Sequence, residues 1–269
     1  MSSSEEKNKR KEVSAISTQN YFKLKWIALL TMLIDHIGVC SAEICHNTFP
    51  DYESYITYCL LRCIGRIAFP VFCFQLVESF YFTKDKKKHL LKISGLAVVS
   101  EIPYNLLHGT VWNPEKQNVC FTLALGFACI WISHLITEKV NLVLSHGIHI
   151  NRIVKFLLQL LNVAVFAFLA FLLKTDYSFA GILMIALMNF SKKYDMNSLF
   201  LMSFVILFLL SGKTAVCCFL AFAVILHFRK KTDDTEKMSV LQKKPVRIIS
   251  SFFYPLHLLL LYLCRIILF

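Results

Sequence analysis

The residues best suited to chemistry in this chain are ionisable side chains that interrupt apolar runs. An ionised group near the centre of a bilayer costs about 2.5 to 3.5 kcal/mol, so each one retained there needs a partner or a task. One apolar run contains Asp35 and His36, and the last run contains His257. Imidazole titrates near neutral pH and can serve as base, acid or nucleophile. We therefore expect His36 to be catalytic, with His257 as the competing histidine and Asp35 as a further candidate.

Polar residues four positions apart extend this set. Such pairs share one helix face and can point into a common interior, and they are Arg62 with Arg66, Glu101 with Asn105, and Asn118 with Thr122. Adjacent residues lie about 100° apart around a helix. Asp35 therefore cannot orient His36, and we expect that carboxylate to be Glu101 or Asp176. The predicted substrate-binding residues are Arg62, Arg66, Asn118, Thr122, Asp176 and Tyr177.

A purely structural interpretation of the same residues stays open. Arg62 and Arg66 could simply neutralise Asp35 and Glu101 as packing ion pairs. Asp35 and Asp176 could be solvated near the membrane surface, and His257 could be an ordinary core histidine.

Three prolines inside apolar runs lie near the charged groups. Pro70, Pro103 and Pro255 lack an N–H, which frees the carbonyl four residues earlier, at Arg66, Val99 and Ser251. Within a membrane such a break needs a replacement partner from protein or water. Each proline is within four residues of an intramembrane ionisable group, and this combination is typical of a site.

The composition indicates that the chain lies in a membrane. The side chains are 57% hydrophobic and the mean hydropathy is +0.59, which excludes a soluble globular enzyme. The net charge is +12, but Lys and Arg occur in short blocks, so we expect a lipid bilayer as partner and no nucleic acid. The ten cysteines are scattered, which favours small apolar filler over disulfides. No metal site is predicted, because Cys59 and Cys63 adjoin the basic Arg62.

The apolar runs predict an all-α, polytopic transmembrane helix bundle. Six runs approach the roughly 20 residues needed to cross a bilayer, at 22–40, 56–82, 89–107, 119–137, 153–173 and 248–268. Three shorter runs lie at 177–190, 198–211 and 214–228. About nine spans, with the N-terminus inside and the C-terminus outside, leave most of the 29 basic residues in inner loops. Residues 1–20 form the expected cytoplasmic tail, and residues 21–269 form a single transmembrane domain.

Several ordered segments of this domain resemble the TraX family of membrane proteins, which is associated with N-acetylation of conjugative pilin. The segments are Leu24–Lys25–Trp26, Asp35–His36–Ile37–Gly38, Arg62 to Pro70, Glu78, Lys86–Lys87–Lys88, Ser100–Glu101–Ile102–Pro103, Asn118 with Phe121–Thr122–Leu123, Asp176–Tyr177 and Phe253 to His257. Segment 191–247 matches only loosely.

The resemblance implies an acyltransferase-like domain that moves acetyl from acetyl-CoA to an amine. For pilin the amine is the subunit's amino terminus, and another peptide or small-molecule acceptor is equally open. His36 would act as general base or carry acetyl briefly, and Glu101 or Asp176 would set its tautomer. Arg62, Arg66 and Asn118 would hold the developing oxyanion or an acceptor carboxylate. We expect a multi-pass protein of the cytoplasmic membrane, with the phosphates of cytoplasmic acetyl-CoA near the inner basic loops.

Two other functions would also place charged groups inside spans. A proton-coupled transporter is the first, although no internal repeat is visible and the charges cluster at one level. A non-catalytic partner in the maturation of a membrane substrate is the second.

Overall fold

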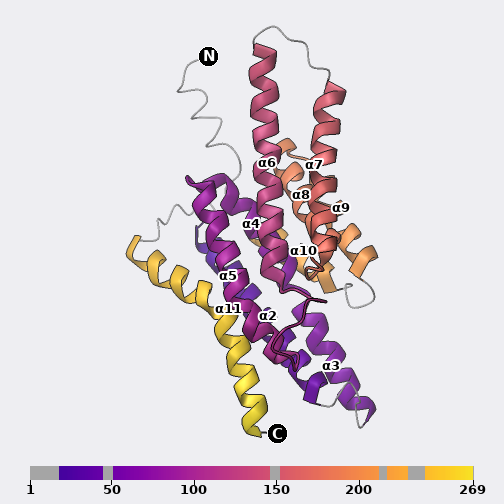
Figure 1. The fold of residues 1–269 in the computed structure, drawn as a ribbon, viewed down its shortest axis with the longest axis vertical. Coiled ribbons are helices and arrows are strands. Elements are labelled where there is room, and N and C mark those ends of the chain that lie inside the picture. Colours follow the sequence, from indigo (N-terminus) through magenta and orange to yellow (C-terminus); the bar gives the residue numbers. More distant parts are fainter. Residues whose placement is uncertain (1–17, 45–50, 146–151, 212–216, 230–239, 269) are drawn as a thin grey trace. The chain divides into compact units, whose positions relative to one another are not determined.

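The structure is a computed structural model of the 269-residue chain, and it describes residues 18–44, 51–145, 152–211, 217–229 and 240–268 (Figure 1). Within these ranges the regular structure is helical, and an isolated bridge joins Gln117 to Thr175. The helices are α2 (Thr18–Ile44), α3 (Tyr52–Gly65), α4 (Ala68–Phe82), α5 (Lys86–Leu107), α6 (Val119–Ser145), α7 (Arg152–Leu172), α8 (Ser178–Tyr194), α9 (Asn197–Ser211), α10 (Cys218–Arg229) and α11 (Val240–Leu268). The expected tail lies outside the described residues as far as residue 17.

The predicted all-α membrane fold is confirmed. Five stretches of the described chain are long and apolar enough to cross a membrane, namely Gln19–Ala42, Tyr52–Phe82, Lys86–Leu107, Val119–Leu142 and Ile153–Leu172. They coincide with five of the six long runs. The described apolar part of the sixth is shorter, at Phe252–Ile267, and Asn197–Leu210 and Cys218–Arg229 are also short. The number of spans and their orientation stay predictions.

The chain forms two compact units. Unit 1 comprises Met1–Glu78 and Lys213–Phe269, and unit 2 comprises Ser79–Gly212. The boundary falls inside α4. Unit 1 therefore contains α2, α3, α10 and α11, and unit 2 contains α5 to α9.

In unit 1, α2 is the central helix and packs against α3, α10 and α11. Asp51 begins α3 by accepting a hydrogen bond from Ser54 N–H at 2.7 Å, and the hydrogen bonds from Ser54 lower the pKa of Asp51. The run expected at 56–82 is interrupted by a turn at Arg66 and Ile67, between α3 and α4. The Arg66 carbonyl, which Pro70 leaves without its helical donor, accepts from Cys218 Sγ at 3.7 Å. This confirms that the protein itself supplies a replacement partner at this proline.

Two glycines let α2 and α3 approach closely. A Cβ built on Gly65 would overlap the Asp35 side chain, and one on Gly38 would lie 3.1 Å from Leu61 Cβ. Both glycines belong to the segments that resemble TraX. Their role there is to let the backbones of α2 and α3 approach closely beside the candidate site residues.

We expect Gly65→Ala to destabilise the protein by about 1 to 3 kcal/mol, because the added methyl overpacks this contact. Gly95→Ala is the control, since a Cβ there meets nothing within 4 Å and alanine favours a helix over glycine by about 1 kcal/mol. The measurement is the apparent unfolding temperature of each protein in detergent. A Gly65→Ala protein as stable as wild type would contradict the close approach of α2 and α3.

In unit 2, α6 packs against α5, α7 and α8, and it runs beside α7 (Figure 1). The core between α6, α7 and α8 consists of Cys129, Val163, Phe166, Ala170, Ile182 and Ala186. Cys129 is a free thiol that packs as a small apolar residue, as expected. Amide side chains also join α6 to α7: Asn162 Nδ2 donates to Ser133 Oγ at 2.8 Å, and Gln159 Nε2 donates to Thr137 Oγ1 at 3.1 Å. Such interhelical hydrogen bonds hold membrane helices together where burial of apolar surface cannot.

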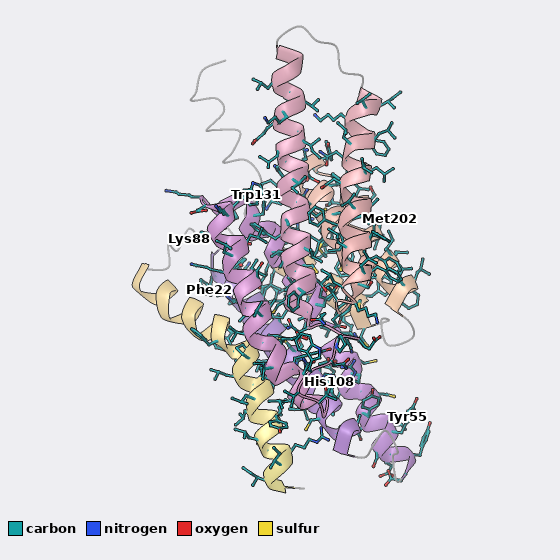
Figure 2. All side chains as sticks on the ribbon, in the orientation of Figure 1. Phe22, Tyr55, Lys88, His108, Trp131 and Met202 are labelled. Atoms are coloured by element: carbon teal, nitrogen blue, oxygen red, sulfur yellow. The ribbon has the colours of Figure 1, made fainter. Side chains whose placement is uncertain are left out.

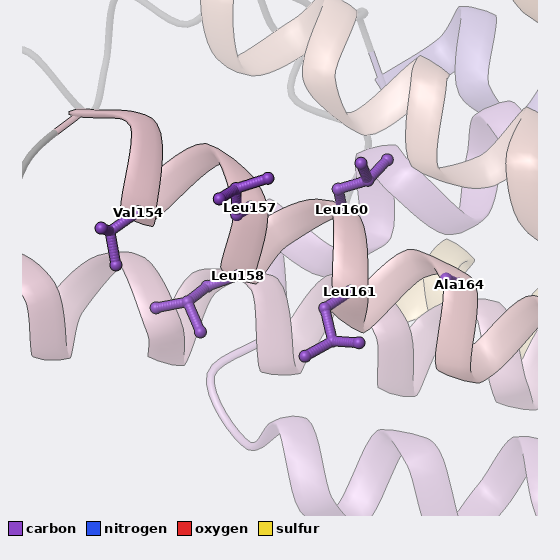
Figure 3. A pocket seen from close by; sticks show the side chains of 6 residues that line it. All are labelled: Val154, Leu157, Leu158, Leu160, Leu161 and Ala164. Atoms are coloured by element: carbon purple, nitrogen blue, oxygen red, sulfur yellow. The ribbon is translucent and has the colours of Figure 1, made fainter.

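The outer surface of α7 is apolar. A shallow groove along it is lined by Val154, Leu157, Leu158, Leu160, Leu161 and Ala164 (Figure 3). Leu160 and Leu161 are more than half exposed. A helix in a bilayer presents such side chains to lipid, so this surface agrees with the membrane assignment.

Candidate active site

A pair of histidines joins α2 to α11 in unit 1. His36 Nδ1 of α2 and His257 Nε2 of α11 are 3.0 Å apart, and both side chains are buried. The Tyr254 ring packs against both imidazoles, with ring centroids 6.1 Å from His36 and 5.7 Å from His257, and Phe253 stacks on His257. The two histidines treated as competitors in the sequence are therefore hydrogen-bonded to each other.

The hydrogen bonds assign the tautomer of both rings. His257 Nδ1 lies 2.7 Å from the Phe253 carbonyl, which can only accept, so Nδ1 carries the proton. A neutral His257 then has its lone pair on Nε2, and His36 must donate from Nδ1. This leaves Nε2 as the basic nitrogen of His36. His257 thus provides one orienting contact to His36.

Asp35 points away from the histidine pair, as the 100° separation predicts. Its Oδ2 accepts from Arg62 Nη1 of α3 at 2.5 Å, and the two side chains are only 19% and 14% exposed. Arg66 is partly buried at the end of α3. The packing ion pair that was considered for Arg62 therefore exists with Asp35. The contact uses Nη1 of Arg62, and the role of its other guanidinium nitrogens is taken up under the proposed function.

A buried carboxylate organises the second group of predicted residues, in unit 2. Glu101 Oε2 accepts from Asn118 Nδ2 at 2.5 Å and from Asn118 N at 3.3 Å, and Oε1 accepts from Asn105 Nδ2 at 3.4 Å. Asn118 Nδ2 also donates to the Ala97 carbonyl at 2.8 Å, while its Oδ1 accepts from Cys120 N at the start of α6. Both donors of the Asn118 amide are thus engaged, so contact with a substrate oxygen would require one of these bonds to break. The predicted pairing of Glu101 with Asn105 on one face is confirmed.

Glu101→Gln tests this network. An NH₂ group replaces one oxygen of Glu101, so a hydrogen bond from Asn118 or Asn105 is lost or the Asn105 amide must turn, and we expect a loss of about 1 to 3 kcal/mol in stability. Glu115→Gln is the control, because that side chain is 72% exposed. Thermal unfolding of both variants is the measurement. If both variants unfold at the wild-type temperature, the network does not stabilise unit 2.

Thr122, Asp176 and Tyr177 also come together in unit 2. Thr122 Oγ1 donates to the Asp176 carbonyl, and Asp176 N donates to the Gln117 carbonyl at 3.0 Å. Tyr177 has a left-handed backbone with φ 60°, as do its neighbours Lys174 and Ser178 at 50° and 41°. Such conformations are costly for residues with a Cβ and cluster at functional sites. The side chains of Asp176 and Tyr177 are half-buried beside this turn.

The predicted residues thus form two groups, one in each unit. His36, His257, Asp35, Arg62 and Arg66 belong to unit 1, and Glu101, Asn118, Thr122, Asp176 and Tyr177 belong to unit 2. A role for Glu101 or Asp176 in orienting His36 stays a prediction. Sequence reasoning missed the close approach at Gly65 and the amide contacts of Gln159 and Asn162. The spacing of Gln159 and Asn162, three positions apart in an apolar run, was the available signal.

Fold and site together define the class: a multi-pass α-helical membrane protein that buries ionisable and amide side chains within its helices. The chain belongs to the TraX family, whose family model, described as TraX protein, matches residues 21–265. The resemblance noted from the sequence segments is confirmed.

Two curated proteins are similar over shorter stretches. The probable fimbrial assembly protein FimC, serogroup H1, of Dichelobacter nodosus is 29% identical over 119 residues, which is 41% of this chain and 45% of that protein. The uncharacterized protein RP591 of Rickettsia prowazekii (strain Madrid E) is 38% identical over 73 residues, 27% of this chain and 23% of that protein. Each match spans less than half of the relative's length. No solved structure matches the chain.

Proposed function

We propose that this protein is a membrane acetyltransferase that moves acetyl from acetyl-CoA to an amine. The observation that carries the proposal is the buried His36–His257 hydrogen bond at 3.0 Å, which supports His36 Nε2 as the basic nitrogen. A neutral imidazole with a fixed tautomer is what general-base catalysis needs. Because acetyl-CoA is cytoplasmic, the enzyme would reside in the cytoplasmic membrane.

The reaction requires one proton to move as two bonds change. The amine nitrogen attacks the thioester carbonyl carbon while His36 Nε2 accepts the proton from that nitrogen. The carbon–sulfur bond then breaks, and the leaving sulfur takes the proton from His36, which gives an amide and coenzyme A. A two-step route gives the same products: His36 Nε2 attacks the thioester carbon and the carbon–sulfur bond breaks, then the amine displaces His36 from the acetyl carbon and its proton goes to the released thiolate.

Arg66, with the remaining donors of Arg62, would stabilise the negative oxygen that develops on the carbonyl. A guanidinium in a partly buried site interacts with an oxyanion far more strongly than in water. Asp35 would then keep Arg62 in place through their ion pair. Asp35 is in this view a positioning residue, with no role in proton transfer.

A peptide amino terminus is the acceptor to test first. The TraX resemblance implies an amine on pilin, and one relative is named as a probable fimbrial assembly protein. A short peptide with a free amino terminus would supply both the amine and a backbone to bind. The same peptide with a blocked amino terminus serves as the negative control.

The experiment uses the full chain, purified in detergent and supplied with labelled acetyl-CoA and the two peptides. We expect acetylated product only with the free amino terminus. His36→Ala should lower the rate by roughly 10²- to 10⁴-fold, with unchanged size-exclusion profile and unfolding temperature. A His36→Ala protein that still transfers acetyl at the wild-type rate would sink the proposal.

A further inference from the structure

A second cluster of polar groups lies in unit 2, around the aromatic residues that end α4. Lys86 Nζ is 4.2 Å from the centroid of Phe80, and the His134 ring is 4.6 Å from it. Tyr81 follows Phe80 and also contacts His134, with ring centroids 5.4 Å apart, while Lys192 Nζ lies 5.1 Å from the Tyr81 centroid. Side chains from α5, α6 and α8 thus meet at two adjacent residues of α4.

Lys193 adds a third ammonium group to this cluster. Its Nζ donates to Thr137 Oγ1 of α6 at 2.8 Å, one helical turn from His134. Among the residues that the structure describes, neither Lys86 nor Lys193 forms an ion pair with a carboxylate. Lys86 and Lys193 therefore bring two positive charges to His134 that no described carboxylate pairs with.

Burial separates these residues from ordinary surface lysines. Lys86 and Lys193 are half-buried, whereas Lys87 and Lys88, which follow Lys86 on α5, are exposed (Lys88 is labelled in Figure 2). His134 Nε2 is buried and has no hydrogen-bond partner within the described part of the chain. Lys86 also donates to the Phe80 carbonyl and, at 2.7 Å, to the Thr83 carbonyl, which caps the end of α4. This cap accounts for the position of Lys86 and involves neither His134 nor Lys193.

We infer that Lys86, His134, Lys192 and Lys193 bind the phosphate groups of an anionic ligand. Phosphate oxygens accept several hydrogen bonds at once, and ammonium groups in a partly dehydrated site bind them strongly. The chemistry is shared by coenzyme A, which carries a diphosphate and a phosphate monoester, and by acidic phospholipids. The identification with coenzyme A rests on the proposed acetyl transfer, whereas the phosphate site rests on the contacts described above.

The test measures binding of coenzyme A, without its acetyl group, to the full chain in nanodiscs of neutral lipid. We expect Lys86→Gln and the double variant Lys192→Gln/Lys193→Gln to weaken binding by roughly ten- to a hundredfold. Lys87→Gln is the control, because it removes the same charge from an exposed position on the same helix. Lys86→Arg and Lys192→Arg/Lys193→Arg keep the positive charge and should retain binding. Size-exclusion profiles of the Gln variants check that they fold.

A second arm tests the lipid source, by measuring how much phosphatidylglycerol stays bound to each variant in native mass spectrometry. Loss of either coenzyme A or phosphatidylglycerol in the Gln variants supports the phosphate site and identifies its ligand. Unchanged binding of both would overturn it.

His36→Ala separates this inference from the proposed function. That variant should bind coenzyme A normally while it loses transfer. Normal ligand binding by the lysine variants alongside His36-dependent transfer would refute only the phosphate site. Lysine-dependent binding without any transfer would refute only the acetyltransferase.

Discussion

Replacing His257 with leucine is expected to lower the turnover number of acetyl transfer roughly ten- to a hundredfold. His257 Nε2 accepts the proton of His36 Nδ1 and so keeps the basic lone pair on His36 Nε2. Without this acceptor the ring of His36 can rotate or adopt the other tautomer. The Michaelis constants for both substrates should change little, because His257 acts through His36.

His257→Gln is the informative partner variant. A glutamine side chain reaches about as far as Nε2 of histidine, and its carbonyl oxygen can accept the same proton. We expect it to recover much of the lost rate, whereas leucine does not. If both variants are equally slow, or both as fast as wild type, the assigned tautomer is wrong.

Local geometry within single helices was predictable from the sequence. Glu101 and Asn105 do share a face, since Asn105 donates to Glu101 at 3.4 Å. Asp35 and His36 do point apart, because Asp35 contacts α3 and His36 contacts α11. Both results follow from the 3.6-residue turn of an α-helix and need no knowledge of the neighbours.

The choice of partner between helices could not be predicted in the same way. His36 and His257 are 221 positions apart, and nothing in either run specifies which helix packs against it. A second imidazole can accept the proton of His36 Nδ1 without placing a negative charge in the membrane, and neither apolar run indicates that this partner is present.

Close approach of backbones was equally hidden. Gly65 is in a helix, where glycine usually costs stability, and only the position of Asp35 explains it. Gln159 and Asn162 were visible as polar residues in an apolar run, yet neutral amides need only a nearby carbonyl or hydroxyl. Their partners, Ser133 and Thr137, are on α6, which packs beside α7 in the structure.

Breaking the Asp35–Arg62 ion pair should have the largest effect on stability. Removing one partner of a buried pair typically costs about 3 to 5 kcal/mol because the other charge stays unpaired. These side chains keep 19% and 14% of their exposure, so we expect a loss of about 2 to 3 kcal/mol for Asp35→Asn or Arg62→Gln alone. The double variant should be closer to wild type than the sum of the two, because it leaves neither charge of the pair without its partner.

Acetyl transfer by the same three variants separates structure from function for Arg62. If Arg62 only packs against Asp35, the double variant should fold and transfer acetyl near the wild-type rate. If Arg62 also holds the oxyanion, the double variant should fold but lose roughly 10²- to 10³-fold in turnover number, as removal of one oxyanion donor does. We expect the second result. Unfolding temperature and turnover number, measured on the same preparations, distinguish the two, and an active double variant would leave Arg66 to stabilise the transition state.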